Sequence, residues 1–91
     1  MRISKKQRLV EQAGLTADEK AALHAEYRGG NGPAIAFARA GLMRIFGTDV
    51  VGETHEAVSA FLGSGQCPKK MMDTFLTLRK AYGYDPSLQV I

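Results

Sequence analysis

The clearest hydrophobic pattern of the chain lies between residues 33 and 46, where only Arg39 and Arg44 carry charge. At about 100° per residue, seven positions share one broad face of a helix: Ala34, Ile35, Ala38, Gly41, Leu42, Ile45 and Phe46. A helix with so few polar residues needs cover over most of its surface. We therefore predict that this helix lies at the centre of the fold.

Four further segments have helical spacing: about 4–13, a helix that starts at Thr16 and ends before Gly29, 54–62 and 68–82. Their ends carry local signals. Gly14 can end the first in the left-handed conformation, and Thr16 with Glu19 has capping-box spacing. Thr54 can cap the helix that follows it. Residues 48–53 are expected to be a connector with a short turn or an extended piece at 50–51, and no convincing run of strands appears.

The pattern predicts an all-α fold, a compact single-domain bundle of about five short helices around the central apolar helix (about 33–46). The 91 residues are expected to form one domain, because a chain of this length builds one modest core. We expect a basic N-terminal arm at 1–8. In the tail at 84–91, Leu88 and Val90 alternate with other residues, which is typical of an extended segment.

Composition indicates where the protein works. Cys67 is alone, so no disulfide supplements the core, and an unpaired cysteine suits a reducing compartment. The basic start is not followed by an apolar run of signal-peptide length, and the two arginines of the central helix argue against a membrane span. We expect a cytoplasmic protein with no membrane partner.

Positive charge gathers near both ends of the chain, which raises nucleic-acid binding as an alternative function. The cations concerned are Arg2, Lys5, Lys6, Arg8, Lys69 and Lys70. The segment 54–82 resembles a helix-turn-helix in outline. The detail fits poorly, because Ser59 stands where a small apolar residue is expected and Pro68 delays the second helix. Asp73 would also repel a phosphate, and charge clusters of this kind are mostly solvated surface.

Signals for chemistry are weak along the whole chain. The glycine-rich turn at 28–33 lacks the lysine and hydroxyl residue of a phosphate-binding loop. A helix start and two nearby lysines could favour a thiolate at Cys67, with His24 or His55 as a base, but no local catalytic signature accompanies them. One cysteine and two separated histidines are a poor zinc signal. We predict no catalytic residue, no metal and no cofactor.

The central helix carries a second, narrower apolar strip opposite its broad face. Ala36, Ala40 and Met43 form this strip, with Arg39 on one flank and Phe37 beside Arg44 on the other. Two interpretations stay open: the other helices sandwich the strip, or it stays open until a partner covers it. Two interpretations also stay open for Arg79. Its aliphatic stem covers the edge of the core, or the side chain is a hot spot of a binding surface.

We therefore predict a small non-enzymatic protein-interaction module, a regulator, adaptor or inhibitor that occupies a surface of a larger protein. Accessory proteins of bacteria or their phages fit this description. The expected partner is either another protein or a second copy of the chain. Its predicted contact residues are Ala36, Phe37, Arg39, Ala40, Met43, Arg44 and Arg79.

Overall fold

A computed structural model describes residues 4–84 of the chain. These residues form six α-helices and no strand, which confirms the predicted all-α class. The helices are α1 (Lys5–Ala13), α2 (Ala17–Glu26), α3 (Gly32–Phe46), α4 (Thr48–Val51), α5 (His55–Gly63) and α6 (Lys69–Tyr84). Arg2 and the expected tail after Tyr84 lie outside the described residues, and Tyr84 itself ends α6.

The local stop and start signals act as predicted. In the capping box of α2, the Thr16 hydroxyl accepts from the Glu19 amide at 3.1 Å, and the Glu19 carboxylate accepts from the Thr16 amide at 3.1 Å. Gly14 ends α1 in the left-handed conformation, with φ 60°. The Thr54 hydroxyl caps α5 by accepting from the Ala57 amide at 3.0 Å.

Of the two alternatives for the connector at 48–53, the structure has the short turn and not the extended piece, since residues 48–51 form the helical turn α4. The turn is four residues long, which is too short for hydrophobic periodicity to appear in the sequence. Its two valines also favour an extended chain on propensity alone. Burial of Val51, which is 1% exposed, holds the turn against the core.

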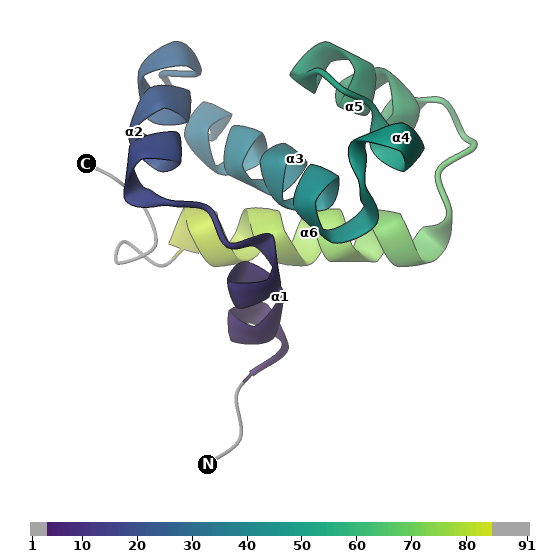
Figure 1. Cartoon of the computed structure of the whole chain (residues 1–91), viewed down its shortest axis with the longest axis horizontal. Coiled ribbons are helices and arrows are strands. Elements are labelled where there is room, and N and C mark those ends of the chain that lie inside the picture. The colour runs from purple at the N-terminus through teal and green to yellow at the C-terminus, as the bar shows by residue number, and fades with distance from the viewer. Residues whose placement is uncertain (1–3, 85–91) are drawn as a thin grey trace.

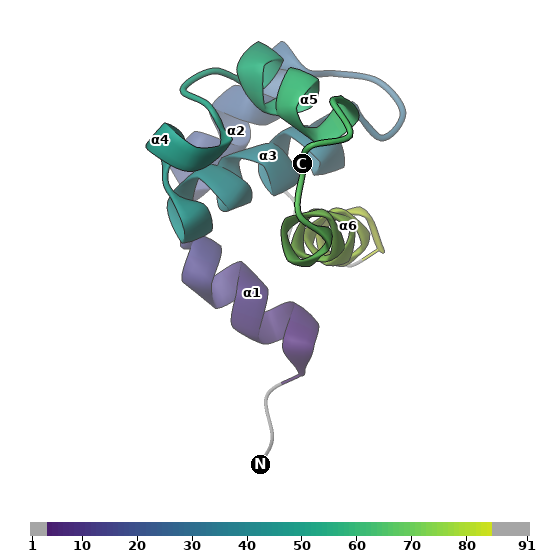
Figure 2. The same cartoon turned by 90° about the vertical axis from the view of Figure 1, so that its right-hand side faces the viewer.

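Helix α3 is central, as predicted, and each of the other five helices packs on it. The long helix α6 lies beneath α3 and crosses it, while α2, α4 and α5 lie on the other side of α3 (Figures 1 and 2). Helix α1 packs on both α3 and α6. The largest fully buried side chains come from four helices: Phe37, Leu42, Val51, Val58, Leu78 and Tyr82.

A glycine allows the closest packing in the core. A Cβ atom at Gly41 of α3 would lie 2.9 Å from Leu78 Cδ1 of α6 and 3.2 Å from Ala13 Cβ of α1. Both distances are shorter than ordinary van der Waals contact. Gly41 therefore lets α1 and α6 approach α3 at one point. Within residues 4–84, none of the helices has the length and apolar character that crossing a lipid bilayer demands.

Candidate functional site

The upper side of α3 forms the floor of an open groove between α2 and the α4–α5 pair (Figure 1). Its larger part has a volume of about 380 Å³ and is lined by Glu19, Ala22, Leu23, Ala40, Met43, Arg44, Thr48 and His55. A smaller part, of about 210 Å³, is lined by Tyr27, Arg39, His55, Glu56 and Ser59. The two parts share His55, so we treat them together as the α3 groove.

Tight turns set both walls of the groove. Between α2 and α3, a Cβ atom at position 32 would lie 2.4 Å from the carbonyl oxygen of Tyr27, so only glycine lets the chain fold back this closely. Between α4 and α5, Gly52 has φ 126°, which side-chain-bearing residues rarely adopt. These two glycines allow the tight turns that lead from α2 into α3 and from α4 into α5.

A polar cluster centred on Arg39 fills the smaller part of the groove. The Arg39 Nε atom donates to His55 Nδ1 at 3.0 Å, and Nη1 donates to Ser59 Oγ at 3.2 Å. The guanidinium carbon lies 5.1 Å from the centre of the Tyr27 ring, within the range of a cation–π contact. The Tyr27 and His55 rings are also 5.1 Å apart. Arg39 thus joins α3 to α5 and to Tyr27, the residue that follows α2.

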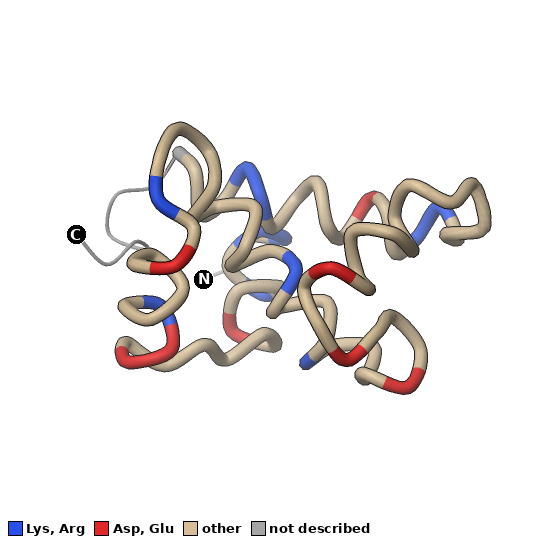
Figure 3. The backbone as a smooth tube through the Cα atoms, turned by 90° about the horizontal axis from the view of Figure 1, so that it is seen from above, with Lys and Arg blue, Asp and Glu red and all other residues tan. Residues whose placement is uncertain are grey.

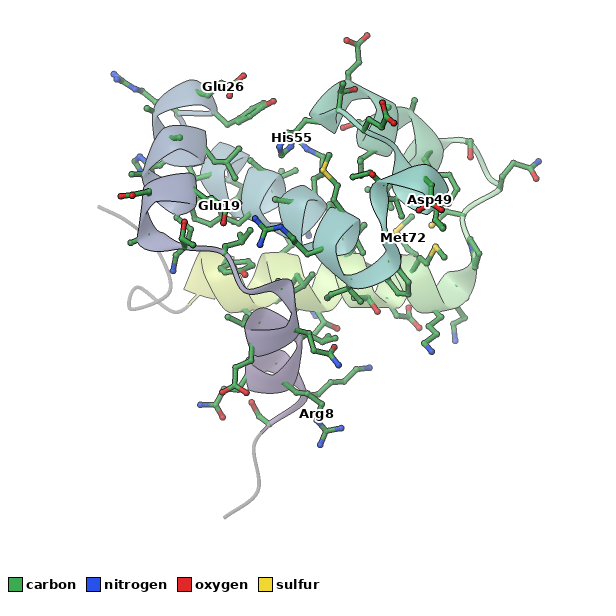
Figure 4. All side chains as sticks on the ribbon, viewed as in Figure 1. Arg8, Glu19, Glu26, Asp49, His55 and Met72 are labelled. Atoms are coloured by element: carbon green, nitrogen blue, oxygen red, sulfur yellow. The ribbon has the colours of Figure 1, made fainter. Side chains whose placement is uncertain are left out.

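His55 is held in its neutral form by this environment. Its Nδ1 accepts a hydrogen bond, so the ring proton resides on Nε2. Burial lowers the pKa of His55 below its usual value, the charge of Arg39 lowers it further, and Glu26 opposes both effects. Figure 4 shows His55 reaching from α5 toward α2, where Glu26 lies.

Arg44 lies at the other end of the groove, where it contacts α2 and the segment that precedes α2. It forms an ion pair with Glu19, and its Nη1 donates to the carbonyl oxygen of Gly14 at 3.3 Å. The backbone hydrogen bond from Thr16 and then the contact with Arg44 lower the pKa of Glu19. Both side chains stay well exposed, so this pair contributes little to stability.

The structure places four of the seven predicted contact residues at the groove. Arg39, Ala40 and Met43 are half-buried along its floor, and Arg44 lies at its end. Ala36 and Phe37 are 0% exposed and belong to the core, which corrects their placement on an open strip. The Phe37 ring packs edge-on to Tyr82 of α6 at 5.4 Å, so the chain itself covers this part of α3.

Arg79 lies apart from the groove. It is exposed on α6 and lines a small hollow of about 50 Å³ with Asn31, Ala34, Lys80 and Gly83. The structure does not bring Arg79 together with the residues of the α3 groove.

The basic residues considered for nucleic-acid binding are all exposed where the structure describes them. Lys5, Lys6 and Arg8 lie on α1, and Lys69 and Lys70 begin α6. The helix-turn-helix outline at 54–82 is absent, because α5 and α6 pack on different sides of α3 (Figure 2). A helix-turn-helix requires its two helices to pack on each other at a fixed angle.

The pKa of Cys67 shifts in the direction opposite to the one that its neighbours in the sequence could favour. Burial raises the pKa of the Cys67 thiol, and a backbone hydrogen bond from Met72 opposes this effect only in part. His24 lies half-buried on α2, whereas His55 lies in the groove. Among residues 4–84, no three or more histidine, cysteine or carboxylate side chains lie close enough to hold a metal ion.

Sequence patterns missed the walls of the groove. Leu23 and Tyr27 line the groove, but their spacing of four residues indicates only that they anchor a helix. The sequence gives no signal that Arg39 contacts His55 and Ser59, which follow it by sixteen and twenty residues. Such contacts join separate helices, so no local spacing reveals them. No protein-family model, curated protein or solved structure matches the chain.

Proposed function

We propose that this chain is a small non-enzymatic protein-interaction module that acts as a regulator, adaptor or inhibitor by receiving part of a larger protein in the α3 groove. One observation carries the proposal. Ala40 and Met43 of α3 are half-buried at the floor of an open hollow, whereas Phe37, Ala38 and Leu42 of the same helix are fully buried in the core. Leu23 and Ala22 continue this apolar surface onto α2.

The shape of the hollow favours a protein surface over a small molecule. Small-molecule sites bury most of their ligand in a concave pocket with a few convergent polar groups. The α3 groove is open, and its two arginines are engaged with other groups of the chain. An open surface with apolar and aromatic residues and an arginine is typical of a protein interface.

Ala40→Trp tests the proposal because it places a large ring in the larger part of the groove. The matched control is Leu76→Trp, which introduces the same ring on the outer face of α6, where Leu76 is 38% exposed. The immobilised parent and both variants are exposed to an extract of the source organism, and captured proteins are identified by mass spectrometry. Light scattering of the purified chain tests a second copy as the partner.

We expect a protein that binds the parent and the Leu76→Trp variant but not the Ala40→Trp variant. Melting curves should show that all three chains are folded. The proposal is wrong if the captured set is the same for Ala40→Trp and parent. It is also wrong if the parent captures nothing and is monomeric by light scattering.

A further inference from the structure

The cations at the α3 groove are already engaged by the chain. Arg39 donates to His55 and Ser59 and lies over the Tyr27 ring. Arg44 is paired with Glu19. A partner that offered carboxylates would have to displace these contacts and leave their polar groups without partners, which costs free energy.

Carboxylates at the groove remain available to a partner. Glu56 lines the smaller part, and Glu26 lies across from it on α2, close enough to His55 to influence its pKa. Within residues 4–84 neither carboxylate forms an ion pair. Residues 45–68, which include α4 and α5, contain three acidic residues and no lysine or arginine. Figure 3, which is seen from above, shows acidic positions along the backbone of both α2 and the α4–α5 region, with lysine and arginine positions between them.

The walls of the groove determine the kind of backbone that it accepts. Both walls and the floor are helices, whose backbone groups are bonded internally, so no sheet edge is available to pair with an extended peptide. A helical segment satisfies its own backbone groups and contributes only side chains. Apolar side chains at spacings of three and four residues would follow the Ala40 and Met43 floor, which has the same spacing.

From these observations we propose that the α3 groove binds a basic amphipathic helix of a partner protein, with its apolar stripe on Ala40 and Met43 and its lysine or arginine residues against Glu26 and Glu56. The inference rests on the proposed interaction function and specifies the chemistry of the partner. The carboxylates favour a basic segment over an acidic one by charge complementarity. The apolar floor supplies the contact area, as in other helix-in-groove complexes.

A pair of synthetic peptides tests this chemistry directly. One is a helix of about four turns built from leucine at every third or fourth position and lysine elsewhere, labelled with fluorescein. Its matched peptide has glutamate in place of each lysine. Fluorescence anisotropy with the full chain gives Kd for both peptides at low and at physiological salt. We expect the lysine peptide to bind at least about tenfold more tightly, with an affinity that falls as salt rises.

Three variants locate the binding site of the lysine peptide. Ala40→Trp should raise its Kd by about tenfold or more because the floor is blocked. The double variant Glu26→Gln with Glu56→Gln should raise Kd by about threefold to tenfold, mainly at low salt. Asp73→Asn removes a carboxylate from the exposed face of α6 and should leave Kd unchanged.

Failure of this inference is distinguishable from failure of the proposed function. Equal or tighter binding of the glutamate peptide overturns the inference, as does lysine-peptide binding that Ala40→Trp does not weaken. If a protein captured from the extract still depends on Ala40, the groove is an interface and only the partner chemistry is wrong. If neither the captured protein nor the peptide depends on Ala40, both proposals fall.

Discussion

One side of α3 is closed by α1 and α6, whereas the side between α2 and α5 is open. On the closed side, Phe37 and Leu42 are fully buried and Gly41 allows close packing. On the open side, Ala40 and Met43 are only half-buried. Both sides are apolar in sequence, so hydrophobicity alone does not separate the residues that hold the fold from those that face a groove. The difference depends on which helix lies over each position.

Replacing adjacent residues on α3 tests this difference most strongly. Leu42→Ala should lower the free energy of unfolding by about 2–5 kcal/mol, because it leaves a cavity in the closed core. Met43→Ala, one residue further on, should lower it by about 1 kcal/mol, since Met43 already contacts solvent. Urea denaturation measures both values. Equal losses would show that the two sides of α3 are packed alike.

A methyl group at Gly41 tests the close packing of the closed side. Overpacking against Leu78 and Ala13 is expected to lower the free energy of unfolding by about 1–3 kcal/mol. The better helix propensity of alanine offsets about 1 kcal/mol of this loss. Gly41→Ala should therefore be destabilising by up to about 2 kcal/mol in thermal denaturation. Gly63→Ala is the control, because a Cβ atom there meets nothing within 4 Å. A Gly41→Ala variant as stable as Gly63→Ala would contradict the packing argument.

The open side should respond to acid through His55. The pKa of His55 is lower in the folded state than in the unfolded chain, so the unfolded chain binds more protons at pH values near these two pKa values. The contribution of neutral His55 to the free energy of unfolding is complete above the pKa of histidine in the unfolded chain, about 6.5. This contribution is lost as the pH falls through the lower pKa of His55 in the folded state. Protonation breaks the hydrogen bond from Arg39 and places two cations together, while Glu26 offsets part of the repulsion.

Denaturation midpoints at pH 8 and at weakly acidic pH, above the range where carboxylates titrate, measure this small effect. The parent should lose stability on acidification, and His55→Gln should lose less. His24→Gln serves as the control, because His24 is absent from the Arg39 cluster. A pH dependence that persists in His55→Gln and disappears in His24→Gln would reverse the assignment.

Much of the fold could be predicted because its signals are local. The capping pair Thr16–Glu19 and the left-handed stop at Gly14 act over three or four residues, which a sequence displays directly. The near-absence of charge on α3 likewise indicated its central place. For the segment of α4 a short turn and an extended piece both stayed open, because four residues carry no period and its two valines are common in strands.

Candidate site residues were predicted only in part, for a different reason. A helical wheel placed Ala36 and Ala40 on one strip, but Ala36 is 0% exposed while Ala40 lines the groove. The wheel gives the direction of a side chain from the helix axis and not what covers it. Arg39 was singled out as a flank of the strip, whereas its partners His55 and Ser59 come from another helix.

The sequence by itself determined the five longer helices, their caps and the apolar centre, because these follow from contacts within a turn or from composition. Only the tertiary structure decided that α6 closes one side of α3 and that α2 and α5 leave a groove on the other. That outcome depends on packing between helices far apart in the chain, through Gly41 and Arg39. Steric fit between such distant residues has no local period, so it emerges only when the chain is folded.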